Sequence, residues 1–317
     1  MSKIIVENKY CSFIDVLGYK NIVLSKTLSN DEKVKFLEDI YSILFSAISG
    51  QLTQIRQNQT ESDKLFIKSF SDCVYLQTND PYVLLFSLHN IYNVAFCYHR
   101  NIPENYTPLL RSGTVRDWTV KIMDIGSLAT HNIDEMYGKD ELANIVGLGI
   151  TRAYLASEES KLSGMRIIVS KEVMDQLKLI KYNNVAFDCF YCECPNFFTH
   201  KDLPKSLKPV KLFFLPIEEN EEGKKVDLFE LCWPVFDYVW SNNNSDIHNS
   251  IDSIFMMQKD FDDKSLRHFK KTAELILKSL IITYTIFPNE YNSEDVSKVI
   301  KKLQVITDTQ FDKPTTI

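Results

Sequence analysis

The chain has 317 residues, of which 44% are hydrophobic and 12% aromatic, enough to bury a sizeable core as one large domain with an accessory part. Its formal net charge of -6 argues against nonspecific binding to duplex nucleic acid or an anionic membrane surface. No apolar run reaches the roughly 20 residues of a membrane span. Because the N-terminus lacks the core of a signal peptide and the seven cysteines are scattered, we expect a cytoplasmic protein without nucleic acid or membrane partners.

The first buried strand is predicted from Tyr10 to Leu17, and it brings Asp15 just before a turn at Gly18. A strand that ends in a carboxylate and then turns on glycine suits a cation beside a phosphate, because the carboxylate holds the metal and the turn amides face the anion. A solvated strand-end acid or a helix cap is the simpler alternative.

A helix is predicted next, because Ser29 and Glu32 form a capping-box pattern and an apolar stripe continues to Gly50. Two short strands then follow between Lys64 and Gln77. They flank the turn Ser71 to Asp72, which indicates a tight hairpin with Asp72 at its tip.

The chain then alternates between helical and strand patterns. Helical spacing is expected from Pro81 to His99, and two strands from Pro108 to Val115 and from Thr119 to Ala129, separated by residues 116–118. A helix, a strand and a helix follow, over 148–158, 166–170 and 171–179. The order β-α-β-β-α-β predicts an α+β fold with ferredoxin-like topology, in which helices cover one face of a mostly antiparallel sheet.

We predict a domain over residues 1–178 and an accessory C-terminal α/β part over 179–317, largely helical after residue 227. Helical patterns run from Asp252 to Phe287 and from Ser293 to Gln304. This part also holds three close cysteines, which with His200 would offer four zinc ligands: Cys189, Cys192 and Cys194. Their spacing is not a usual structural zinc pattern, so we expect buried thiols instead.

Asp15 and Asp72 belong together in this topology. In a ferredoxin-like sheet the first strand neighbours the hairpin, so the two carboxylates converge although they are far apart in sequence. Paired carboxylates beside a glycine turn are what two divalent ions on a triphosphate require. Two unrelated turn aspartates remain the alternative.

Five short motifs in order resemble class III nucleotidyl cyclases, and more closely the divergent bacterial branch that includes the pyrimidine cyclases of Pycsar anti-phage systems. The motifs are FIDVLGY, SFSDCVY, LLRSGTV, GLGITRAYLASEE and MRIIVS. They cover about the first half of the chain. No single motif is specific, but their order on the expected elements is.

The resemblance implies that Asp15 and Asp72 hold two Mg²⁺ or Mn²⁺ ions, with the main-chain carbonyl of Val16 as a further ligand. The backbone around Gly18 and Tyr19 would cradle phosphate oxygens. The implied reaction forms a 3′,5′-cyclic nucleotide and pyrophosphate.

The resemblance also assigns base recognition, to Lys68 and Asn144. A lysine only donates, whereas an asparagine both donates and accepts, so together they match uracil, and a flipped amide matches cytosine or adenine equally well. A pyrimidine preference therefore comes from the branch resembled. An outward-facing strand lysine is the other interpretation of Lys68.

The chain departs from the class III pattern at Thr151 and Leu155, where that class carries its transition-state asparagine and arginine. Another cation must then stabilise the developing charge. The candidates are Arg111, Arg116 and Arg152, and we favour Arg111 because it lies in a shared strand motif. Each is also explicable as a surface or salt-bridging residue.

Class III sites form between two catalytic domains, so the resemblance implies a homodimer with composite sites. The leading hypothesis is a cyclase that makes cyclic UMP or cyclic CMP from the nucleoside triphosphate, as a second messenger in phage defence. An enzyme acting on ATP or GTP, and a catalytically silent domain that binds nucleotide or a partner, are the alternatives.

Overall fold

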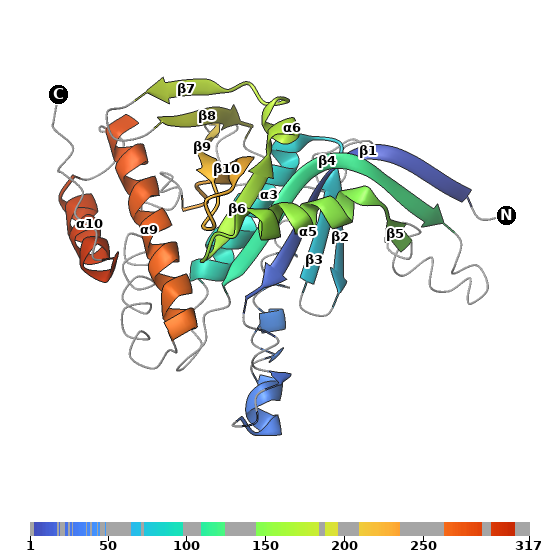
Figure 1. Ribbon diagram of the computed structural model, residues 1–317, viewed down its shortest axis with the longest axis horizontal. Coiled ribbons are helices and arrows are strands. Elements are labelled where there is room, and N and C mark those ends of the chain that lie inside the picture. The colour runs from blue at the N-terminus through green and yellow to red at the C-terminus, as the bar shows by residue number, and fades with distance from the viewer. Residues whose placement is uncertain are drawn as a thin grey trace, which may run out of the picture.

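The structure is a computed structural model that describes residues 3–17, parts of 19–48, and residues 65–70, 73–97, 109–123, 144–183, 188–195, 209–234, 263–286 and 293–307. The bounds of its elements, in chain order, are β1 (Lys3–Val16), β2 (Phe66–Phe70), β3 (Cys73–Thr78), α3 (Pro81–Cys97), β4 (Leu110–Met123), β5 (Asn144–Val146), α5 (Leu148–Ser160), β6 (Arg166–Ser170), α6 (Lys171–Met174), β7 (Ile180–Asn183), β8 (Asp188–Cys194), β9 (Val210–Glu219), β10 (Lys225–Leu231), α9 (Asp263–Ile286) and α10 (Ser293–Thr307). The predicted α+β class is confirmed (Figure 1).

The described strands form a single sheet in the order β2-β3-β1-β4-β6-β10-β9-β8-β7, with β5 paired to β4. Neighbouring strands are antiparallel except β4 and β6, which are parallel. Strands β7 to β10 follow residue 178, so the predicted domain boundary lies at a point where the same sheet continues. Autonomous folding of residues 1–178 stays a prediction.

Local patterns were predictive in the first half of the chain. Phe70 pairs with Cys73 and the two strands are antiparallel, so β2 and β3 form a hairpin, as predicted. The capping box is confirmed, since Glu32 accepts hydrogen bonds from the amide and the hydroxyl of Ser29, and the Glu32 amide donates back to the Ser29 hydroxyl. Helices α9 and α10 confirm, within the described residues, the helical patterns predicted from Asp252 to Phe287 and from Ser293 to Gln304.

Two strands were predicted where the structure has the single strand β4. Residues 116–118 were interpreted as a break between two strands, yet all three pair with β1, Arg116 with Tyr10 and Trp118 with Asn8. Strand β1 itself begins at Lys3, earlier than predicted. Strands β1 and β4 pair along their whole length, and this pairing keeps both of them extended.

Helices lie on both faces of the sheet, which corrects the prediction of helices on one face. Helix α3 packs with Ile14 of β1, whereas α5 packs with Cys11 of the same strand. Because side chains alternate across a strand, these two residues point to opposite faces. Figure 1 shows α5 in front of the strands and α3 behind them. Both faces of β1 carry buried side chains, and both therefore need a cover.

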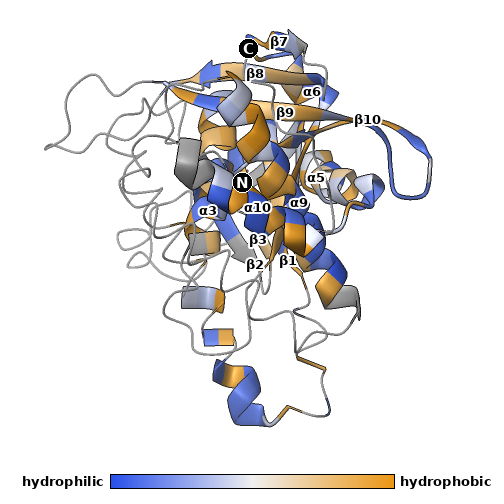
Figure 2. Ribbon diagram, turned by 90° about the vertical axis from the view of Figure 1, so that its left-hand side faces the viewer, coloured by the Kyte–Doolittle hydropathy of each residue, from blue (hydrophilic) through white to orange (hydrophobic). Residues whose placement is uncertain are grey.

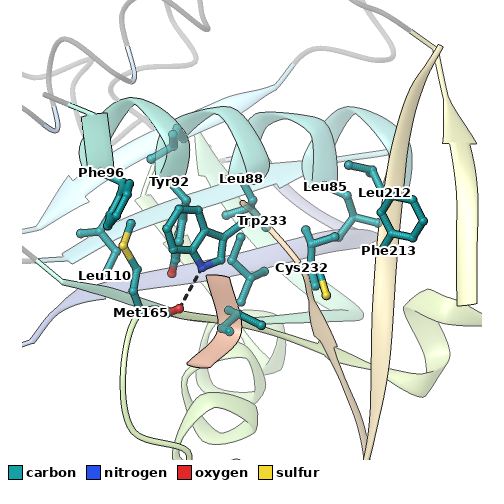
Figure 3. Close-up of a cluster of buried hydrophobic side chains, with 14 of the residues drawn as sticks. Leu85, Leu88, Tyr92, Phe96, Leu110, Met165, Leu212, Phe213, Cys232 and Trp233 are labelled. Carbon is teal, nitrogen blue, oxygen red and sulfur yellow. Dashed lines mark hydrogen bonds between the residues drawn. The ribbon is translucent and has the colours of Figure 1, made fainter. Parts of the chain in front are cut away.

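The larger core lies between the sheet, α3 and the C-terminal helices. Trp233 is fully buried there, its ring centroid 5.3 Å from that of Phe96, and its indole nitrogen donates to the Met165 carbonyl at 2.9 Å (Figure 3). The Tyr92 hydroxyl donates to the Arg166 carbonyl at 3.0 Å. These contacts join α3, β6 and the segment after β10. Among the helices that the structure describes, none has the length and apolar content to cross a membrane.

Helix α5 approaches the sheet closely because its buried side chains are small. They are Gly149, Ala153, Ala156, Ser157 and Ser160. On the strand below, a Cβ at Gly113 would overlap the Ala153 carbonyl oxygen and lie 2.8 Å from the Ser157 amide nitrogen. The glycine of the LLRSGTV motif therefore has a packing role.

Replacing Gly113 with alanine should lower the free energy of unfolding by about 3 kcal/mol, because α5 must move off β4 to make room. Gly223→Ala is the control, since its Cβ would meet nothing within 4 Å and the cost is only that of a backbone at φ +75°, about 1 kcal/mol. Urea unfolding of both variants measures the difference. Equal losses would contradict the close packing of α5.

Candidate functional site

Asp15 lies near the end of β1, in a row of side chains that crosses three strands. It is opposite Cys73 of β3 on one side and Arg111 of β4 on the other. Directly opposed residues point to the same face of a sheet, so this row lies on the face that α5 covers. The carboxylate is 23% exposed, and the Cys73 thiol lies 3.7 Å from its Oδ1 oxygen.

The structure does not describe all of the predicted site residues. Asp72 lies outside the described residues, as does Gly18, but Asp72 is bonded to Cys73, which is directly opposite Asp15. Val16 ends β1, and the partly buried Tyr19 packs on the larger core. Among the described residues there is no cluster of three or more metal-ligating side chains.

Arg111 is the basic residue that the structure brings to Asp15. Its Nη2 nitrogen lies 3.7 Å from Asp15 Oδ2 and donates a short hydrogen bond to Glu158 Oε1 on α5. The Arg111 side chain is 17% exposed. Within the described part of the chain, its buried Nε has no hydrogen-bond partner. A buried donor without a partner is uncommon, and it marks a place where a ligand oxygen would be favourable.

The other two candidate arginines are used elsewhere. The Arg152 guanidinium is 44% exposed and pairs with Asp117 and Glu172. Arg116 lies over the Tyr10 ring, 5.5 Å from its centroid. Neither contact involves Asp15, so the geometry favours Arg111.

Glu158 was not predicted from the sequence. Its contact with Arg111 joins residues 47 positions apart, and no local pattern reports such a pair. The available signal was a carboxylate at the end of the otherwise small-residue face of α5.

The two predicted base readers lie at different distances from Asp15. Lys68 is half-buried on β2, opposite Tyr75, in the row of side chains one step along the α5 face from Asp15, roughly 12 Å away. Asn144 begins β5 and is opposite Ile122 of β4, which is opposite Ile4 at the far end of β1. That separation from Asp15 is on the order of 30 Å.

The cysteines are buried thiols, as predicted. Cys189, Cys192 and Cys194 lie on β8 and are fully buried, while His200 lies outside the described residues. Burial raises the pKa of the Cys192 thiol to about 12 and, beneath α5, the pKa of Cys11 to about 12. Both thiols are therefore protonated at neutral pH.

No family model and no curated protein matches the chain. Solved structures similar to it include the guanylyl cyclase Cya2, with 11% identity over 72% of this chain and 93% of that chain and a TM-score of 0.43. An adenylate/guanylate cyclase/hydrolase from Silicibacter pomeroyi has 11% identity over 72% and 98%, TM-score 0.39. A class III adenylyl cyclase-like ATP-binding protein from Pseudomonas aeruginosa has 10% identity over 54% and 35%, TM-score 0.39. At TM-scores below 0.5, these similarities carry no inference about activity.

Arg111→Met should lower the free energy of unfolding by about 2 kcal/mol, because it leaves two partly buried carboxylates without their shared cation. Arg152→Met removes a more exposed cation, which pairs with Asp117 and Glu172, and should cost less than about 1 kcal/mol. Thermal unfolding at neutral pH compares the two variants. A larger loss for Arg152→Met would contradict the central place of Arg111 in this cluster.

Proposed function

We propose that the chain is a metal-dependent nucleotidyl cyclase that converts a pyrimidine nucleoside triphosphate, UTP or CTP, into its 3′,5′-cyclic monophosphate and pyrophosphate, in the cytoplasm, as a second messenger in phage defence. The carrying observation is the cross-strand row in which Asp15 lies between Arg111 and the residue that follows Asp72. The resemblance of the sequence motifs to cyclases indicates the reaction. The row supports the proposal that the motifs around Asp15, Asp72 and Arg111 meet at one site.

The residues present fit a divalent metal. Asp15 and the Val16 carbonyl lie at the end of β1, and with Asp72, which lies outside the described residues, they would supply hard oxygen donors, the ligand type that Mg²⁺ and Mn²⁺ prefer. Two ions bound there would supply activation of the ribose 3′-hydroxyl and neutralisation of the triphosphate charge. The positively charged guanidinium of Arg111 would repel a cation at Asp15, so metal binding depends on where Arg111 lies.

Arg111 is the residue that we assign to the phosphate. Its Nε has no partner among the described residues, and a guanidinium presents donors in a fork that matches phosphate oxygens. It would bind a nonbridging oxygen and stabilise charge as the 3′-oxygen attacks the α-phosphorus and the pyrophosphate leaves. Exposed Thr151 and Leu155 on α5 offer no cation for this role.

A homodimer with composite sites would bring Asn144 of one chain to Asp15 of the other. Asn144 and Asp15 lie at opposite ends of the β1–β4 pair, so one chain does not bring both to the same nucleotide. A second copy with the opposite orientation would, and twofold symmetry would then create two equivalent sites. Lys68 and Asn144 would hydrogen-bond the base, and the backbone near Gly18 and Tyr19 would contact the phosphates.

A silent nucleotide-binding domain is the second candidate, and one observation favours it. Arg111 already supplies a positive charge 3.7 Å from Asp15, which lowers the affinity of that carboxylate for a metal. Such a domain would bind nucleotide without releasing pyrophosphate. Nucleotide binding that persists in both Asp15→Asn and Asp72→Asn would support it.

Purified protein with Mn²⁺ should form one cyclic nucleotide from UTP or CTP, identified by mass spectrometry against parallel reactions with ATP and GTP. Asp15→Asn and Asp72→Asn should each lower the rate at least about a hundredfold, because each removes a metal ligand. Asp227→Asn, which changes an exposed acid on β10, should not. Product from ATP or GTP alone would overturn the pyrimidine assignment, and full activity of Asp15→Asn would overturn the metal site.

The composite site can be tested by mixing two inactive variants, Asp15→Asn and Asn144→Ala. If the two residues serve one site from different chains, a mixed dimer keeps one intact site. Co-refolding equal amounts should then recover about a quarter of wild-type activity, since half of the dimers are mixed and each has one of two sites. Zero recovery, with a mixed dimer present by mass spectrometry, would contradict composite sites.

A further inference from the structure

Arg111 is shared unequally between two carboxylates. Its Nη2 donates a hydrogen bond to Glu158, while Asp15 Oδ2 lies at 3.7 Å, beyond hydrogen-bond distance. The same nitrogen makes both approaches, and its hydrogen bond goes to Glu158. Asp15, Arg111 and Glu158 are 23%, 17% and 32% exposed, which leaves their charges only partly screened by water.

The backbone on both sides fixes the position of Glu158. Toward the N-terminus, α5 lies directly on Gly113, so the helix cannot shift without losing this contact. At its C-terminal end, the Lys161 amide donates to the Glu158 carbonyl at 3.2 Å from a left-handed cap. The Asn220 side chain, from the β9–β10 turn, donates to the Glu159 carbonyl at 3.0 Å. Figure 2 shows this turn as a hydrophilic loop beside α5.

We infer that Glu158 is a positioning residue that holds the guanidinium of Arg111 off Asp15, so that Asp15 keeps its affinity for a divalent cation. The inference rests on the proposed metal site. Without Glu158, the guanidinium is free to form a close pair with Asp15. A cation at Asp15 would then have to displace it.

Glu158 could affect cation binding through its own charge or through the position of Arg111, and the two cases predict different binding by the variants. The three side chains sum to one negative charge, and removing either acid makes the group neutral. If Glu158 acts by its own charge, its loss weakens cation binding whether or not Arg111 is present. If it acts through Arg111, the effect vanishes when Arg111 is absent. A double-mutant cycle separates these two cases.

The experiment measures Mn²⁺ binding to the full chain, by the electron paramagnetic resonance signal of free Mn²⁺, so it does not depend on activity. Glu158→Gln should weaken binding about tenfold, and Arg111→Gln should strengthen it severalfold. The double variant should match Arg111→Gln within about twofold. Glu159→Gln, which removes an exposed charge on the next residue, should match wild type.

Glu158→Asp supplies a second test that keeps the charge. Aspartate is one methylene shorter and loses the contact with Arg111, so it should also weaken binding, while thermal unfolding verifies that each variant is folded. Equal weakening by Glu158→Gln with and without Arg111, or wild-type binding by Glu158→Asp, would overturn the inference. If Asp15→Asn binds Mn²⁺ as wild type does, both the proposed metal site and the inference are overturned. Binding that depends on Asp15 but ignores Glu158→Gln overturns the inference alone.

Discussion

The close contact of α5 with β1 and β4 is the constraint on which the rest of the candidate site depends. It needs small residues on both sides, Gly113 on the strand and Ala153 and Ser157 on the helix. A larger side chain at any of them would raise the helix and carry Glu158 away from Arg111. The same contact covers the second apolar face of the sheet, so packing and electrostatics at Asp15 share one cause.

The C-terminal elements are hydrogen-bonded to the segment that follows this helix. After α5, the Gly164 amide donates to His268 and the Met165 amide to Thr272, both on α9. Arg166 pairs with Glu230 of β10, and both side chains are 6% exposed. A buried ion pair contributes little net stability, but removing one partner leaves the other charge buried and unpaired. The second half of the chain is thus part of the frame that carries the site.

Features that depend on neighbouring residues were predictable. The hairpin of β2 and β3 and the capping box at Ser29 each involve residues close in sequence, and local geometry decides them. The β4 strand was split because residues 116–118 look like a break until β1 is present to pair with them. The Arg111–Glu158 contact was missed for the same reason, since only the folded sheet and helix bring it together. The function itself rests on motif order and stays a proposal.

The pairing of β1 with β4 has a consequence for how the chain matures. Strand β1 is synthesised before β4, its longest partner, which ends at Met123. At the usual rates of synthesis, the interval is on the order of ten seconds. Throughout it, a strand whose C-terminal half will be buried on both faces has one long edge without its partner. Such non-local pairing also slows folding, since a large loop must close first. The yield of this protein should therefore depend strongly on expression conditions that slow aggregation, even if the folded protein is stable.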